Sequence, residues 1–220
     1  MNGYRQLTVL GSTGSIGRST LDVVSRCDNI SVFALSAYRN SEMLLSQCLQ
    51  YEPRYAVLVD PEQNQHFKRL LAESGCKTKF LDTEDALELI AAHEQVDVVM
   101  AAIVGAAGLA SGLAAVSAGK RLLLANKESL IMSGKLFIEA AKQNNADIIP
   151  IDSEHNAIFQ CLAETRSGLS VTDGRFVDKL VLTASGGPFL YTPKEALAKV
   201  TPEQACAHPK WSMGQKISVD

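Results

Sequence analysis

The stretch Leu7-Thr8-Val9-Leu10-Gly11-Ser12-Thr13-Gly14-Ser15-Ile16-Gly17 decides the fold. A short strand-like run enters a turn rich in glycine, and apolar residues then recur at helical spacing over residues 15–26. Such a turn offers free backbone N–H groups and the positive end of a helix dipole to a dinucleotide pyrophosphate. Gly11 permits the tight turn, Gly14 allows close approach of a phosphate, and Gly17 lets the helix pack against the sheet. The stretch predicts dinucleotide binding; the alternative is a turn with a structural role only.

Strand-like and helix-like segments alternate over residues 1–150. Short β-branched runs are separated by longer segments with apolar residues at helical spacing. This alternation predicts a parallel sheet covered by helices on both faces. We expect an α/β fold with a Rossmann-like, doubly wound, mostly parallel sheet, with strands at residues 7–10, 30–36, 55–59, 96–101, 121–124 and 147–150 and helices at residues 15–26, 41–50, 62–74, 83–93, 106–118 and 133–144.

The alternation weakens after Pro150, and we expect a domain boundary there. Residues 1–150 form the predicted nucleotide-binding domain, and residues 151–220 begin a second domain. Residues 184–211 hold four prolines and two adjacent glycines, which predicts a mobile surface segment. Because the sequence stops in a strand-like run at residues 216–220, we expect this second domain to be truncated.

The composition is typical of a soluble protein. A formal net charge of -3 with scattered Lys and Arg disfavours nucleic-acid binding. The most apolar stretch, residues 96–116, is interrupted by glycines and changes period, so it predicts a buried strand and helix, not a membrane span. The five cysteines are odd in number and form no Cys-x-x-Cys pair, which indicates reduced thiols. No signal or transit peptide precedes the first strand, so a cytoplasmic location is expected.

The end of the second predicted strand indicates which nucleotide is preferred. An NAD-preferring site usually has an acidic residue here to bind the ribose 2′-hydroxyl, whereas this sequence has Tyr38-Arg39-Asn40. Arg39 offers a planar cation to a 2′-phosphate and Asn40 can add a hydrogen bond. The pair predicts NADPH over NADH; the alternative for Arg39 is a solvated loop side chain.

Two carboxylates follow the last predicted strand, in Asp152-Ser153-Glu154-His155-Asn156. They fall at the carboxyl edge of the sheet, where ligands of open α/β folds collect. Asp152 and Glu154 could hold a hard divalent cation such as Mg²⁺ or Mn²⁺ and leave positions for a substrate carbonyl and hydroxyl. The alternative is a helix start capped by Asp152 or Ser153. His155 is expected on that helix, supporting the site.

Three other motifs are weaker. Asn126 and Lys127, in Ala125-Asn126-Lys127-Glu128-Ser129, end a strand at the same edge and could approach nicotinamide and substrate, or could form an exposed charged turn. Ser185-Gly186-Gly187-Pro188-Phe189 has the character of a phosphate-accepting turn. Trp211, in the segment from His208 to Gly214, could close over a substrate as a lid or could fill a small core.

Taken in chain order, the five motifs at residues 11–17, 125–129, 152–156, 185–189 and 208–220 resemble the 1-deoxy-D-xylulose 5-phosphate reductoisomerase family over essentially the whole chain. The resemblance implies an NADPH- and metal-dependent oxidoreductase and isomerase of the non-mevalonate isoprenoid pathway. It also implies that residues 151–220 begin an α+β catalytic domain, with the metal-binding motif and an active-site lid, which is truncated here. Such an enzyme converts 1-deoxy-D-xylulose 5-phosphate to 2-C-methyl-D-erythritol 4-phosphate, by a retro-aldol and aldol rearrangement followed by hydride reduction.

The resemblance also implies residue roles. The NADPH ligands would be Thr13, Gly14, Ser15, Ile16, Arg39, Asn40, Asn126 and Gly214. The metal ligands would be Asp152 and Glu154, with Mg²⁺ or Mn²⁺ as the ion. The phosphosugar substrate would contact Lys127, Ser153, Glu154, Ser185 and His208, and the catalytic set would be Lys127, Asp152, Glu154, His208 and Trp211.

Members of the family place a third metal carboxylate and further phosphate-binding residues shortly after the position where this sequence ends. We therefore expect NADPH binding to persist, metal binding to be weak and turnover to be undetectable in this chain. The full-length form is expected to be a homodimer. Two other readings stay open: an NADP-dependent reductase without rearrangement, and a non-catalytic dinucleotide-binding module.

Overall fold

The computed structural model describes residues 5–162, 177–183 and 186–210. The chain divides into two compact units, residues 1–156 and 157–220. The expected domain boundary near residue 151 stays a prediction, because a division into compact units does not by itself show where a functional domain begins. Each unit is treated separately below.

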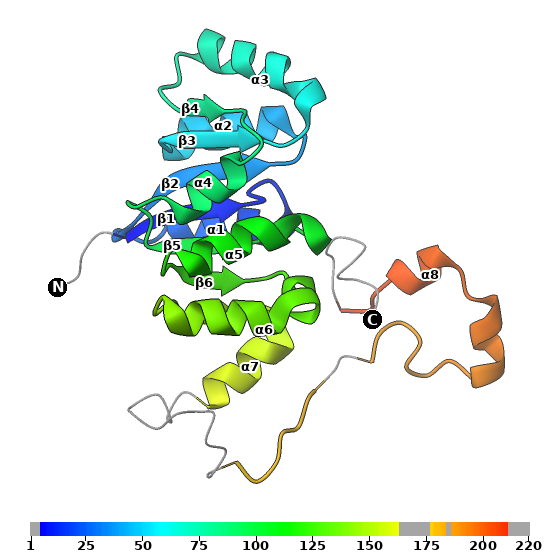
Figure 1. Ribbon diagram of the computed structural model, residues 1–220. Helices are drawn as coiled ribbons and strands as arrows, with labels where there is room; N and C mark the ends of the chain where they lie inside the picture. Colours follow the sequence, from blue (N-terminus) through cyan, green and yellow to red (C-terminus); the bar gives the residue numbers. More distant parts are fainter. Residues whose placement is uncertain (1–4, 163–176, 184–185, 211–220) are drawn as a thin grey trace. The chain divides into compact units, whose positions relative to one another are not determined.

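The first unit is built on a seven-stranded sheet in which every strand pairing is parallel (Figure 1). The strand order is β4-β3-β2-β1-β5-β6-β7, so the chain moves outward from β1 in one direction and then returns to build the other half. The switch in direction lies between β1 and β5, and the predicted doubly wound α/β fold is confirmed. The strands are β1 (Arg5–Leu10), β2 (Ile30–Ala37), β3 (Tyr55–Leu58), β4 (Lys79–Leu81), β5 (Val98–Ala101), β6 (Arg121–Leu124) and β7 (Ile148–Pro150).

Helices cover both faces of this sheet, and each face has its own apolar core. The helices α1 (Ser15–Val24), α2 (Ser41–Tyr51) and α3 (Pro61–Ser74) bury Leu21, Leu44 and Phe67 against one face. The helices α4 (Ala86–Ala92), α5 (Leu109–Ser117) and α6 (Lys127–Gln143) bury Ile90, Val116 and Phe137 against the other face, which is turned to the viewer in Figure 1. The short 3-10 helix η1 (Gly105–Gly108) precedes α5.

The sequence missed two features of this unit. Strand β4 was not predicted because it has only three residues, too few to show a period. Helix α6 starts at Lys127, whereas the predicted helix started at residue 133. The helix is kinked at Ser133, where φ is -145° and ψ is 26°. The kink breaks the helical spacing, so only the second part of α6 was visible as a pattern.

The second unit contains the end of α7 (Ser153–Cys161), the 3-10 helix η4 (Lys194–Lys199) and α8 (Pro202–Cys206). Helix α8 begins with a capping box, in which Thr201 and Gln204 each accept a hydrogen bond from the other's backbone N–H. The described residues of this unit include no strand, so its predicted α+β character stays a prediction. Among the helices of the described residues, none is long and apolar enough to cross a membrane.

Replacing Phe137 by Ala tests the two-sided core. The Phe137 ring is fully buried and approaches Gly112 of α5 closely enough that a Cβ at Gly112 would lie 3.2 Å from its Cζ. Phe137→Ala should therefore lower the free energy of unfolding by about 3–5 kcal/mol in a denaturant titration, because it leaves a cavity. The neighbouring Leu136 is 56% exposed, and Leu136→Ala should change stability by no more than about 0.5 kcal/mol. Equal losses in both variants would contradict this assignment of the core face.

Candidate active site at the carboxyl edge of the sheet

The turn after β1, at residues 11–14, has the geometry of a phosphate-binding loop and is termed the phosphate turn. Gly11 has a φ of +83°, and a Cβ there would lie 2.9 Å from the carbonyl oxygen of Ala102, so glycine is required. The N-cap residue of helix α1 is Gly14, which supplies no side-chain cap, and the first turn of the helix has no acidic residue. In contrast, Asn40 and Asp60 cap the starts of α2 and α3. The N–H groups at the start of α1 are therefore available to an anion.

Gly17 packs somewhere other than predicted. A Cβ at Gly17 would lie 2.3 Å from the carbonyl oxygen of Gly11 and 2.5 Å from the Cα of Ser12. The missing side chain at Gly17 thus lets the first turn of α1 lie against the phosphate turn, while Leu21 and Val24 further along α1 pack in the core on the sheet. The sequence shows that glycine occurs here, but not which backbone comes close.

Arg39 and Asn40 follow β2 at the same edge. Arg39 Nε lies 3.5 Å from Asp60 Oδ2, and the Arg39 guanidinium lies 4.9 Å from the ring centroid of Tyr38. The Tyr38 side chain and, secondarily, Asp60 raise the pKa of Arg39, so it remains a cation. The contact with Asp60 uses Nε, and the guanidinium has two further nitrogens, Nη1 and Nη2, of the kind that donate to a phosphate. Asn40 Oδ1 accepts a hydrogen bond from Met43 N as the cap of α2, which leaves its NH₂ group as the donor for a phosphate.

Asn126 lies at the end of β6 and is 3% exposed. Its Nδ2 donates to the Gly105 carbonyl at 2.9 Å, and Gly108 makes room for it, since a Cβ there would lie 2.7 Å from Nδ2. Within the described residues, Asn126 Oδ1 and the hydroxyl of Ser129 are buried without a hydrogen-bond partner. Buried polar atoms normally have partners, so Asn126 Oδ1 is an acceptor that a ligand amide could bind once a local shift exposed it. The fit to a dinucleotide therefore rests on the start of α1 and on Arg39.

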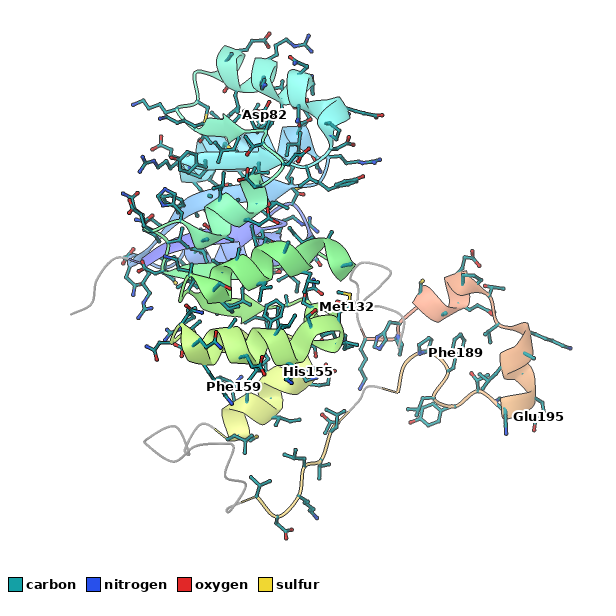
Figure 2. All side chains as sticks on the ribbon, in the orientation of Figure 1. Asp82, Met132, His155, Phe159, Phe189 and Glu195 are labelled. Atoms are coloured by element: carbon teal, nitrogen blue, oxygen red, sulfur yellow. The ribbon has the colours of Figure 1, made fainter. Side chains whose placement is uncertain are left out.

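Lys127 and Asp152 are brought together from neighbouring strands. Lys127 is the first residue of α6, and its Nζ lies 3.0 Å from Asp152 Oδ2 just beyond β7. His155 of α7 lies with its Nδ1 2.8 Å from Asp152 Oδ1 (Figure 2 labels His155). The Lys127-Glu128 segment is thus more than a solvated turn. The carbonyl of Asp152 accepts the first helical hydrogen bond of α7, from Asn156 N, whereas its carboxylate serves Lys127 and His155.

The electrostatics of this pair keep both groups charged. Burial by itself would raise the pKa of Asp152, but hydrogen bonds from His155 and Lys127 outweigh it and hold that pKa below its ordinary value. The hydrogen bond to Asp152 raises the pKa of Lys127 despite partial burial. Both groups are therefore ionised across the neutral range, as metal or anion binding requires.

The donor set for a metal is incomplete in the described residues. Asp152 and Glu154 supply hard oxygen ligands of the type that Mg²⁺ and Mn²⁺ prefer. However, the described part of the chain has no group of three or more His, Cys, Asp or Glu side chains arranged to hold an ion. Both oxygens of Asp152 also have protein partners. The residues fit a divalent ion that takes its remaining ligands from elsewhere.

The remaining candidate residues are only partly described. Ser153 is exposed in the first turn of α7, next to Asp152 and Glu154. Gly186 and Gly187 both adopt positive φ values, +80° and +60°, as the predicted glycine turn requires, and the Nδ1 of His208 accepts a hydrogen bond from Lys210 N. Ser185, Trp211 and Gly214 lie outside the described residues. Because the two units are described separately, the roles of these residues stay predictions.

Comparison with known proteins agrees with this geometry. Residues 7–134 match the family model described as 1-deoxy-D-xylulose 5-phosphate reductoisomerase, and residues 148–220 match the model of that enzyme's C-terminal domain. The chain belongs to the 1-deoxy-D-xylulose 5-phosphate reductoisomerase family.

Individual reductoisomerases show how far the likeness extends. The curated reductoisomerase of Cellvibrio japonicus is 56% identical over 226 residues, which cover 100% of this chain and 56% of that protein. A crystal structure of a reductoisomerase with NADPH, fosmidomycin and magnesium superposes with a TM-score of 0.89 at 43% identity, covering 97% of this chain and 53% of the other. The enzyme from Zymomonas mobilis in complex with NADPH gives a TM-score of 0.83 at 43% identity, covering 93% and 52%. The chain thus spans about half the length of the reductoisomerases it matches.

The phosphate turn can be tested with a pair of glycine variants. Gly17→Ala should lower the free energy of unfolding by about 1–3 kcal/mol, because its methyl group would overlap the backbone of the turn. It should also weaken NADPH binding, since the turn must move. Gly134 of α6 has no atom within 4 Å of an added Cβ, so Gly134→Ala should leave stability unchanged or raise it by up to about 1 kcal/mol. The site geometry would be wrong if calorimetry found NADPH affinity unaltered in Gly17→Ala.

Proposed function

We propose that the whole protein converts 1-deoxy-D-xylulose 5-phosphate to 2-C-methyl-D-erythritol 4-phosphate, using NADPH and a divalent metal ion. The observation that carries the proposal is the contact between Lys127 and Asp152, at the edge that also bears the phosphate turn. Family membership adds support, because structures of relatives have been solved with NADPH and magnesium.

The dinucleotide would lie across the carboxyl ends of the central strands. Thr13, Gly14, Ser15 and Ile16 would hold the pyrophosphate through the start of α1, and Arg39 and Asn40 would hold the 2′-phosphate. Asn126 lies two strands from β1, or about 10 Å, on the opposite side from β2, and would orient the nicotinamide end. Gly214 completes the proposed set. When bound, NADPH supplies the hydride for the reduction.

Asp152 and Glu154 would hold the metal ion, Mg²⁺ or Mn²⁺, which when bound supplies Lewis-acid stabilisation of negative charge on substrate oxygens. Lys127, held beside Asp152 as a cation, would stabilise an oxyanion during the rearrangement or present a proton to it. Ser153, Ser185 and His208 are the remaining proposed substrate contacts, and Trp211 is the proposed lid that excludes water.

We also propose that the whole protein is a cytoplasmic homodimer that binds neither nucleic acid nor membrane. All five cysteines are free thiols, which suits a reducing compartment. The formal net charge of -3 gives no polybasic surface for nucleic acid or anionic lipid.

Arg39 should set the nucleotide preference. Arg39→Ala removes the guanidinium fork, so NADPH affinity should fall by about 10-fold while NADH affinity stays constant. Arg39→Lys keeps the charge without the planar guanidinium, so its NADPH affinity should lie between those of the unsubstituted chain and of Arg39→Ala. Isothermal titration with both nucleotides measures the ratio. An unchanged ratio in Arg39→Ala would leave this arginine as a solvated loop residue.

Asp152 should carry the metal affinity of the chain. Asp152→Asn should abolish measurable Mn²⁺ binding, because an amide replaces a charged ligand. Asp147 is a matched control, since it is an exposed carboxylate at the opposite end of β7 and pairs with Arg121 at 2.7 Å. Asp147→Asn should therefore leave Mn²⁺ affinity unchanged. If Asp152→Asn binds Mn²⁺ as tightly as the unsubstituted chain, the ion is held elsewhere.

The activity itself is tested by completing the chain. We expect the 220-residue chain to bind NADPH without detectable turnover. A chimera that continues it with the second part of the Cellvibrio japonicus reductoisomerase should be active in the presence of Mn²⁺. Turnover of a simple aldehyde without metal would favour the reductase that performs no rearrangement. Nucleotide binding without activity in the chimera would favour the binding module.

A further inference from the structure

A glutamine occupies a buried position on the apolar face of α2. Gln47 is 7% exposed and lies beside Leu44 and Cys48, both fully buried. Burying an amide is unfavourable unless its donors and acceptor find partners. The structure shows what Gln47 contacts: its Oε1 accepts from the Ser12 hydroxyl at 2.6 Å, and its Nε2 donates to the Ser12 carbonyl at 3.0 Å. Both ends of the amide thus bind one residue of the phosphate turn.

Ser36, near the end of β2, also holds this turn, and its carbonyl lies 3.1 Å from the Ser12 hydroxyl. Gly11 N donates to the Ser36 hydroxyl at 3.0 Å, and Ser12 N donates to the Ser36 carbonyl at 2.7 Å. Ser12 is itself fully buried and cannot touch a nucleotide. Its contacts therefore serve to hold the backbone of the turn in one position.

Helix α2 also presents the other part of the nucleotide site. It starts at the cap residue Asn40, directly after Arg39, and Gln47 lies about 10 Å further along the helix. Gln47 consequently ties the turn that faces the pyrophosphate to the helix whose start faces the 2′-phosphate. A shift of either element is transmitted to the other through these two hydrogen bonds.

We propose that Gln47 is a positioning residue for the dinucleotide, acting through Ser12 on the phosphate turn. This inference rests on the proposed dinucleotide site. Gln47 sets the geometry of the N–H groups that receive the pyrophosphate, which NADPH and NADH have in common. Its loss weakens both nucleotides equally, whereas loss of Arg39 affects NADPH alone.

The test is a calorimetric titration of Gln47→Met with NADPH and with NADH. Methionine fills a similar volume but removes both hydrogen bonds, so both affinities should fall by about 10-fold with their ratio unchanged. If both nucleotides bind Gln47→Met as they bind the unsubstituted chain, Gln47 only fills space and the proposal is overturned. A change in the ratio would overturn it as well, since it would place the effect at the 2′-phosphate.

Tyr51 provides a matched control on the same helix. Its hydroxyl donates to the Leu21 carbonyl at 3.0 Å, which joins α2 to α1 away from the turn. Tyr51→Phe should lower the thermal unfolding midpoint while both nucleotide affinities stay constant. An equal loss of affinity in Tyr51→Phe would mean that any weakening of α2 impairs the site, and the specific role of Gln47 would be wrong.

Ser12→Ala supplies a second route if Gln47→Met folds poorly. It removes the hydroxyl, which donates to Gln47 and also lies 3.1 Å from the Ser36 carbonyl, and it keeps the Ser12 carbonyl that Gln47 Nε2 binds. Both affinities should therefore fall by about 3-fold. Because Gln47 acts through Ser12, the double variant should lose less affinity than the product of the single losses. Wild-type affinity in Ser12→Ala overturns the proposal. Absence of NADPH binding by the unsubstituted chain overturns the dinucleotide proposal, and this inference with it.

Discussion

The parallel hydrogen bonding of β1 with β2 and β5 is the constraint on which the site depends. Parallel strands end at the same edge, so the turn after β1, Arg39 after β2 and Asn126 after β6 reach one side of the sheet without any contact between their side chains. The hydrogen bond from Ser12 N to the Ser36 carbonyl continues the β1–β2 pairing past the end of β1. The phosphate turn is therefore held by the sheet and is more rigid than an ordinary surface loop.

Charge is distributed unequally along this edge, and the distribution separates two kinds of chemistry. Over β1 and β2 the groups are positive: the start of α1 and the Arg39 side chain, which Asp60 orients but only partly neutralises. Over β6 and β7, Lys127 is paired with Asp152. A cation held by Asp152 would compete with Lys127 for that carboxylate. Without a cation, the partly buried carboxylate of Asp152 is paired with Lys127 and His155.

Much of this arrangement could be read from the sequence, because the signals are local. A strand, a glycine turn and a helix follow one another within residues 7–26, and the residues after each strand determine what the edge carries. The kink at Ser133 and the three-residue β4 left no such signal. The packing of Gly17 against Gly11 was also hidden, since it depends on the angle at which α1 leaves the turn. Sequence periodicity describes which face is buried but not which backbone lies beneath it.

Gln47 illustrates where sequence reasoning can be extended. A polar residue at a position where helical spacing calls for an apolar one is a signal, as is an orphaned amide oxygen such as Asn126 Oδ1 in the described structure. Neither is visible as a motif, because Ser12 lies 35 residues from Gln47 and the surroundings of Asn126 Oδ1 are set by the fold. The proposed contacts of the nucleotide site, apart from Gly214, lie within residues 1–156, as do Gln47 and Ser12 behind them. This unit has an apolar core on each face of its sheet. Nucleotide affinity should thus depend on that unit, whereas we expect full metal affinity and turnover to need further ligands in addition to Asp152 and Glu154.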